Sequence, residues 1–187
     1  GSALLMNAIV GMMNQGGWQH QRGSNMLDGG AHFYGSYATK DGKYVSIGSI
    51  EPQFYALLLE KTGLAQDAAM QAQMDRGEWP ALREKLADVM ATKTRDEWDA
   101  IMLGTDICYA PVLNFNEAAQ HEHNQARQTF VTANNVTQAA PAPRFSRTAP
   151  EMPEAPVAPG AQTDAVLADL GMSADEIAAL KSSGAVA

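Results

Sequence analysis

The sequence has a single cysteine, Cys108, among its 187 residues. One thiol cannot form an internal disulfide, and sparse cysteine is typical of proteins from reducing compartments. We therefore expect a cytoplasmic protein. Cys108 lies in the apolar segment "ICYAPVL" (107–113), which we interpret as a buried strand, and we predict that it is a small core residue.

Basic residues and long apolar runs are also scarce. The net charge is −8 and the pI is about 4.9, which argues against a nucleic-acid-binding surface. The longest apolar stretch, "ALLMNAIVGMM" (3–13), is interrupted by Asn7 and is shorter than the roughly 20 residues of a membrane-spanning helix. It also lacks the basic region of a signal peptide. We expect neither nucleic acid nor a membrane as a partner.

Several motifs that would indicate a particular chemistry are missing. The sequence contains no Walker A motif, no GxGxxG and no GxSxG. His121 and His123 alternate as a pair of metal ligands could, but no further ligand follows at a metal-binding spacing. We therefore interpret the two histidines as polar surface residues and predict no metal site.

Hydrophobic residues make up 45% of the chain, which is enough for a packed core. Residues 32–50 alternate as two strands joined at Asp41-Gly42, which we expect to supply the positive φ angles of a hairpin turn. Pro52 and Gly63 are placed to begin and end a helix. Further helices are expected after Pro80, after a capping box at Thr94 and Glu97, and over 115–120.

The two ends differ from this middle part. Residues 5–13 have helical spacing, while 138–162 are rich in proline and are expected to run extended. Two helices follow, the second with a capping box at Ser173 and Glu176. The pattern predicts an α/β fold with an α+β small domain, in which helices pack on an antiparallel, hairpin-based sheet.

Glu51 occupies the junction of strand and helix in "SIEPQFYALL" (49–58). Polar residues are common at helix starts, and a carboxylate there benefits from the helix dipole. A glutamate at such a junction can equally be half of an acid–base pair. The local pattern alone favours the helix-start interpretation but leaves both open.

Three segments carry a resemblance to a known family: "GSNMLDGGAHFYGSYATKDGKYVSIGSIEPQFY", "DICYAPVLNFNEA" and "PAPRFSRT", followed by the terminal helix pair. Together they resemble the C-terminal half of α-methylacyl-CoA racemases, in the family III CoA-transferase superfamily. The resemblance covers about residues 1–184. It implies that 1–31 end a large Rossmann-like domain, that 32–123 form a small α/β domain, and that 124–187 return to the large one. It also implies an interlocked homodimer.

The resemblance implies a function as well. Such racemases invert 2-methyl-branched acyl-CoA thioesters by removing the α-proton and returning one to the opposite face, without a cofactor. The family's glutamate, which is paired with a catalytic histidine, falls on Glu51. The histidine itself and a catalytic aspartate belong to the half that this sequence does not contain, so we expect the chain alone to be inactive.

Six residues are candidates for substrate binding. Gly29 and Gly30 are expected to let the backbone approach the ligand, or to form a turn. Asp28 is expected to cap this loop and is given no catalytic role. The remaining four are expected to line the acyl-chain surface, with ordinary core packing as the alternative: Met26, Leu27, Tyr34 and Ile50.

Two other functions remain open. One is a family III CoA transferase, which forms a covalent acyl intermediate on an aspartate. The other is a stand-alone, non-catalytic module that oligomerises. Glu51 favours the racemase. Arg144 and Arg147 are expected to anchor the extended arm through salt bridges rather than to bind phosphate.

Overall fold

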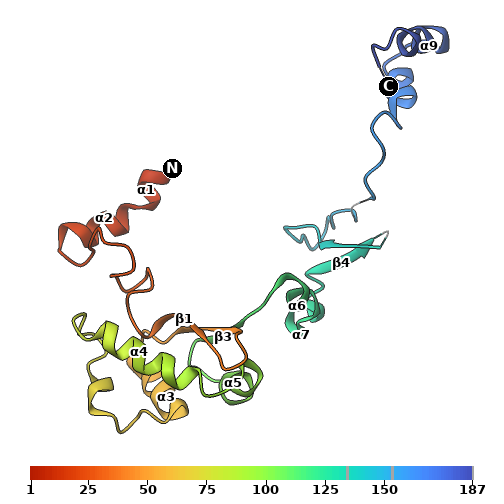
Figure 1. Cartoon of the computed structure of the whole chain (residues 1–187). Coiled ribbons are helices and arrows are strands. Elements are labelled where there is room, and N and C mark those ends of the chain that lie inside the picture. Colours follow the sequence, from red (N-terminus) through yellow and green to blue (C-terminus); the bar gives the residue numbers. More distant parts are fainter. Residues whose placement is uncertain (134, 153, 187) are drawn as a thin grey trace. The chain divides into compact units, whose positions relative to one another are not determined.

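The alternating residues of 34–48 form the expected hairpin. In the computed structural model, which describes residues 1–133, 135–152 and 154–186, β1 (Tyr34–Ala38) pairs antiparallel with β2 (Tyr44–Gly48). β3 (Tyr109–Val112) pairs antiparallel with the other side of β2, giving the order β1-β2-β3. Helices pack on this sheet (Figure 1), so the predicted α/β class with an antiparallel sheet is confirmed.

The hairpin turn differs from its prediction at one residue. Gly42 has the expected positive φ of +73°, whereas Asp41 is not among the positive-φ residues. The Asp41 carboxylate instead accepts hydrogen bonds from the hydroxyl of Thr39 at 2.6 Å and from the backbone N–H of Arg95 at 3.1 Å. Asp41 therefore ties the turn to the start of a distant helix.

Three helices cover the sheet. The first, α3 (Pro52–Thr62), ends at Gly63 with φ +76°, as predicted. It is followed by the 3₁₀ turn η1 (Ala68–Gln71), by α4 (Trp79–Met90) and by α5 (Arg95–Met102). The capping box expected at Thr94 and Glu97 is present at the start of α5. Local signals thus place both ends of α3 and the start of α5 correctly.

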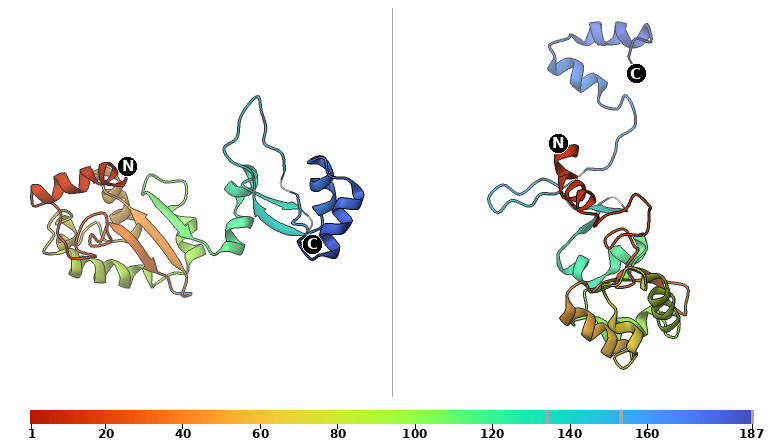
Figure 2. Two further views of the ribbon diagram at one scale, coloured as in Figure 1. Left: turned by 90° about the horizontal axis from the view of Figure 1, so that it is seen from above. Right: turned by 90° about the vertical axis from the view of Figure 1, so that its left-hand side faces the viewer.

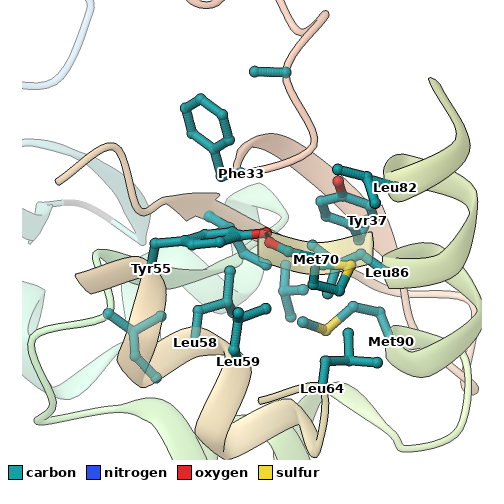
Figure 3. Close-up of a cluster of buried hydrophobic side chains, with 14 of the residues drawn as sticks. Phe33, Tyr37, Tyr55, Leu58, Leu59, Leu64, Met70, Leu82, Leu86 and Met90 are labelled. Carbon is teal, nitrogen blue, oxygen red and sulfur yellow. Dashed lines mark hydrogen bonds between the residues drawn. The ribbon is translucent and has the colours of Figure 1, made fainter. Parts of the chain in front are cut away.

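The core lies between the sheet and these helices. Tyr37, Val45 and Ile47 are buried on the helix side of the sheet, whereas Ser36 and Tyr44 face outward and are exposed. Figure 3 shows leucines of α3 and the buried face of α4 pointing toward one another, with Met70 between them. The face of α4 that is turned to the core carries the buried residues Leu82, Leu86 and Met90.

The segment 107–113 is not the buried strand that its composition suggests. Ile107 is fully buried, but β3 is an edge strand whose residues Ala110 and Val112 are exposed. Cys108 is exposed and has φ +60°, so its prediction as a core residue is wrong. The physical reason is that burial alternates from Ile107 to Val112, and Cys108 falls with Ala110 and Val112 on the solvent-exposed side of this edge segment.

The chain forms two units, Gly1–Asn114 and Phe115–Ala187. The first unit begins with α1 (Ser2–Leu5) and α2 (Asn7–Asn14), which have no buried residue. The second contains α6 (Phe115–Gln120), α7 (Glu122–Ala126), the hairpin of β4 (Phe130–Ala133) and β5 (Val136–Ala139), and the helix pair α8 (Thr163–Asp169) and α9 (Ala174–Ser182) (Figure 2). The division at 31/32 and 123/124 stays a prediction.

The β4–β5 hairpin was not predicted. Its signal is present in "FVTANNVTQA" (130–139), where two β-branched runs flank an Asn-Asn pair. Asn135 has φ +63°, a conformation that asparagine tolerates better than most residues.

The capping box at Ser173 and Glu176 is confirmed. Within the described residues, no helix has the length and apolar character needed to span a membrane.

Candidate functional site

Glu51 occupies the N-cap position of α3, with φ −71° and ψ 141°. Its backbone carbonyl accepts hydrogen bonds from the N–H groups of Phe54 at 3.1 Å and Tyr55 at 3.0 Å. Its side chain makes no capping hydrogen bond and is exposed to solvent. The backbone of Glu51 therefore begins the helix, and its carboxylate is left available for another group.

The residues just before Glu51 are held tightly. Ser49 is fully buried, and its hydroxyl donates to the carbonyl of Ile107 at 2.5 Å. The amide of Gln73 donates to the carbonyls of Ser49 at 3.1 Å and Ile50 at 3.0 Å. The indole N–H of Trp79 in turn donates to the carbonyl of Gln73 at 2.8 Å. These bonds connect the end of the hairpin to the segment that leads into α4.

The loop that carries Met26 and Leu27 is organised by two polar side chains. Asn25 is buried, and its amide donates to the Asp28 carboxylate at 2.8 Å. The backbone N–H groups of Asn25 and Gly23 donate to the same carboxylate at 2.7 and 3.2 Å. Burial alone would raise the pKa of Asp28, but these hydrogen bonds outweigh it and lower the pKa. Asp28 thus makes the loop-capping contacts expected of it.

The two glycines that follow differ in their surroundings. Gly29 has φ +94° and open space where a Cβ atom would lie. A Cβ atom on Gly30 would lie 2.6 Å from the carbonyl carbon of Ser24 and 2.7 Å from the nitrogen of Asn25. The close approach at Gly30 is therefore to the loop's own backbone, which favours the turn interpretation for this residue.

The structure brings together only some of the predicted binding residues. Gly29 and Tyr34 line one pocket of about 480 Å³, on the outer face of the sheet beside Cys108. Met26, Tyr34 and Ile50 are half-buried and pack against the core, while Leu27 is 40% exposed. Five of the seven predicted site residues lie outside this pocket: Met26, Leu27, Gly30, Ile50 and Glu51. Their roles toward a substrate stay predictions.

His32 does not pair with Glu51. It is fully buried, and its Nε2 atom lies 2.8 Å from the hydroxyl of Tyr55, which donates its own proton to the carbonyl of Met70 at 2.7 Å. Nε2 therefore carries the ring proton, and Nδ1 is buried with no hydrogen-bond partner among the described residues. Burial, and secondly the positive charge of Arg83, lowers the pKa of His32 to about 4. A neutral, enclosed imidazole of this kind is a structural group rather than an accessible base.

Two other features concern possible metal ligands and the contacts of Arg144. Across the described parts of the chain, no group of three or more His, Cys, Asp or Glu side chains could hold a metal ion. Arg144 donates to the backbone carbonyl of Gln128 at 2.7 Å, so its anchor among the described residues is a neutral one and not the expected salt bridge. Sequence reasoning missed Gln73, because nothing in the segment "AQDAAMQAQM" (65–74) distinguishes the one glutamine that becomes buried.

Comparison with known proteins gives relatives over most of the chain. The chain is 44% identical to the α-methylacyl-CoA racemase of Mus musculus over 185 residues, which is 97% of this chain and 48% of the mouse protein. It is 44% identical to the human α-methylacyl-CoA racemase over 168 residues, 88% of this chain and 44% of that protein. The chain thus spans about half the length of these relatives.

A solved structure shares the fold. The crystal structure of Rv3272 from Mycobacterium tuberculosis, in its orthorhombic form, matches with a TM-score of 0.58 and 14% identity. The match covers 79% of this chain and 38% of that one. The family model of CoA-transferase family III matches residues 2–164, well over half of the sequence. The chain therefore belongs to CoA-transferase family III.

Proposed function

We propose that this chain forms the C-terminal half of an α-methylacyl-CoA racemase, which interconverts the 2R and 2S epimers of 2-methyl-branched acyl-CoA thioesters without a cofactor. The observation that carries the proposal is the 44% identity to the mouse racemase over 185 residues. The reaction needs two groups on opposite sides of the α-carbon, one to remove a proton and one to return it. The complete protein is proposed to be a homodimer in which a Rossmann-like half supplies those groups.

In this proposal, Glu51 orients an imidazole that comes from the other half. A carboxylate beside a histidine selects its tautomer and stabilises the imidazolium that forms when the ring takes a proton. Glu51 suits this role because its carboxylate is exposed and has no hydrogen-bond or ion-pair partner among the described residues. Met26, Leu27, Tyr34 and Ile50 are proposed to contact the acyl chain, with Gly29 and Gly30 shaping the loop beside it.

The chain alone is proposed to be inactive. A single carboxylate cannot both remove the α-proton and return one from the opposite face. His32 cannot replace the missing base, because its ring is buried and hydrogen-bonded to Tyr55.

The test is deuterium exchange at the α-carbon of a 2-methylacyl-CoA in D₂O. We expect no exchange from the 187-residue chain. A chimera that joins the unmatched, preceding part of the mouse racemase to this chain should exchange the proton, and Glu51→Gln should reduce its kcat by about 10²-fold or more. Glu60→Gln, at an exposed glutamate near the other end of α3, is the matched control and should leave kcat unchanged. Robust exchange by the chain alone would contradict the proposal.

A CoA transferase is the second candidate, favoured by the name of the family whose model matches. That reaction would form an acyl–aspartyl anhydride on the chimera when it is given an acyl-CoA and a free carboxylic acid. If hydroxylamine traps such an adduct and no α-proton exchange is seen, the protein is a CoA transferase and the racemase proposal is wrong.

A further inference from the structure

Gln73 is the residue whose contacts converge on the backbone in front of Glu51. The residue is only 9% exposed, and its Nε2 atom donates to two successive carbonyls, those of Ser49 and Ile50. Its own carbonyl accepts the indole N–H of Trp79, the first residue of α4. The backbone of Gln73 is therefore held by Trp79, and its side chain holds the strand–helix junction in place. We call these contacts of Gln73 the clamp.

The geometry of this clamp bears directly on Glu51. The carbonyl of Ile50 belongs to the planar peptide unit that ends at the Cα atom of Glu51. The next peptide unit is held as well, because the carbonyl of Glu51 accepts the N–H groups of Phe54 and Tyr55. With both planes held, the Cα–Cβ bond of Glu51 has a defined direction, although its carboxylate contacts no described partner.

Glu51 differs in this respect from the glutamates of the two capping boxes. The carboxylates of Glu97 and Glu176 turn back to the N–H groups of Thr94 and Ser173, both at 2.8 Å, and complete capping boxes. These two side chains serve their own helices. Glu51 has a rigid base and an unused carboxylate, which is the arrangement that an orienting group for an external imidazole requires.

We propose that Gln73 is a positioning residue for Glu51: by holding the Ile50–Glu51 peptide plane, it sets where the carboxylate meets the imidazole. The proposal rests on the proposed racemase function and extends it to a residue that touches neither substrate nor base. A shift of about 1 Å in such a group can cost about 100-fold in rate.

The first test uses the chimera described above. Gln73→Met keeps the side-chain length but removes both donated hydrogen bonds. We expect kcat for α-proton exchange to fall about 10- to 100-fold while KM stays within about twofold, since Gln73 acts on the orientation of Glu51 and not on acyl-CoA binding. Gln71→Met is the matched control, because Gln71 is exposed and donates only to the carbonyl of Ala65. A kcat unchanged in Gln73→Met, or lowered equally in Gln71→Met, would overturn the proposal.

The second test does not depend on activity. In the 187-residue chain, hydrogen exchange of the Phe54 and Tyr55 amides reports whether the start of α3 is held. We expect exchange at these amides to be about tenfold faster in Gln73→Met and unchanged in Gln71→Met. Unchanged exchange in Gln73→Met would overturn the positioning role even if the chimera were active. If the chimera with native Gln73 is inactive, the racemase function fails, and the exchange result alone decides whether Gln73 holds Glu51.

Discussion

His32 combines complete burial with an unpaired ring nitrogen, Nδ1. Its pKa is lowered from 6.5 to about 4, so the folded protein keeps this ring neutral in a range where the unfolded chain protonates it. Above pH 6.5 both states leave the ring neutral and the stability contributed by this difference is fully present. As the pH falls from 6.5 toward 4, the unfolded state binds an extra proton and that stability is lost.

We therefore expect the free energy of unfolding to decrease from pH 7 to pH 5, with about 2 kcal/mol of the decrease due to His32. Urea denaturation at the two pH values measures the decrease. His32→Gln should reduce the difference between the two pH values by about that amount. His20→Gln, at an exposed histidine, should leave the difference as in the native chain. An equal pH dependence in native chain and His32→Gln would disprove this assignment.

Gly30 gives a second prediction at the residue scale. A methyl group there meets the backbone of Ser24 and Asn25 at 2.6–2.8 Å, and backbone atoms cannot turn aside as a flexible side chain could. Gly30→Ala should therefore lower the free energy of unfolding by about 1–3 kcal/mol. Thermal unfolding measures this effect. Gly11→Ala is the control, since Gly11 lies in α2 with open space around it, and it should not lower the stability.

At the scale of elements, helix starts show how local signals act. α5 presents Trp98 to the core, and the capping box of Thr94 and Glu97 fixes where this helix begins. In the same helix, the backbone N–H of Arg95 donates a hydrogen bond to the carboxylate of Asp41 in the hairpin turn. The start of α5 thus serves both the helix and its attachment to the sheet.

Thr94→Ala should destabilise the first unit by about 1 kcal/mol, because the hydroxyl that accepts the N–H of Glu97 is removed. Thr92→Ala is the control: its hydroxyl donates to the carbonyl of Val89 at the end of α4 and caps no helix start. Denaturant unfolding monitored by tryptophan fluorescence compares the two variants. A loss for Thr92→Ala as large as that for Thr94→Ala would contradict a specific role of the cap.

At the scale of the molecule, the buried apolar side chains are unevenly distributed. The hydrophobic core cluster draws all its buried members from residues 31–107, within the first unit. In the described part of the second unit, Ile177 is the buried hydrophobic residue. Because burial of apolar surface is the main source of stability, the two units should differ strongly in their resistance to unfolding.

We expect a chain cut after Asn114 to keep the cooperative unfolding of the first unit, with a Tm within a few degrees of that of the whole chain. Hydrogen exchange on the whole chain should be slow for amides of β1, β2 and α4 and fast throughout the described residues of 115–186. Loss of cooperative unfolding on truncation would show instead that the first unit depends on the second.

Much of the fold could be predicted because its signals are local. Pro52 and Gly63 mark α3, Thr94 and Ser173 begin capped helices, and Gly42 has the φ that its turn requires. The β4–β5 hairpin has comparable signals, but the proline-rich residues that follow it favour an extended, unpaired chain. The two strands are short and have little of the apolar alternation that would indicate a hairpin.

The candidate site divides in the same way. The sequence by itself determined the family resemblance and the place of Glu51 at a strand–helix junction, since both depend on residues that are neighbours in the chain. Only the tertiary structure decided that the Glu51 carboxylate caps nothing, that Cys108 is exposed, and that Gln73 clamps a peptide 23 residues away in the chain. Burial and long-range hydrogen bonds depend on which segments meet in the folded chain, and no local pattern of residue types specifies that.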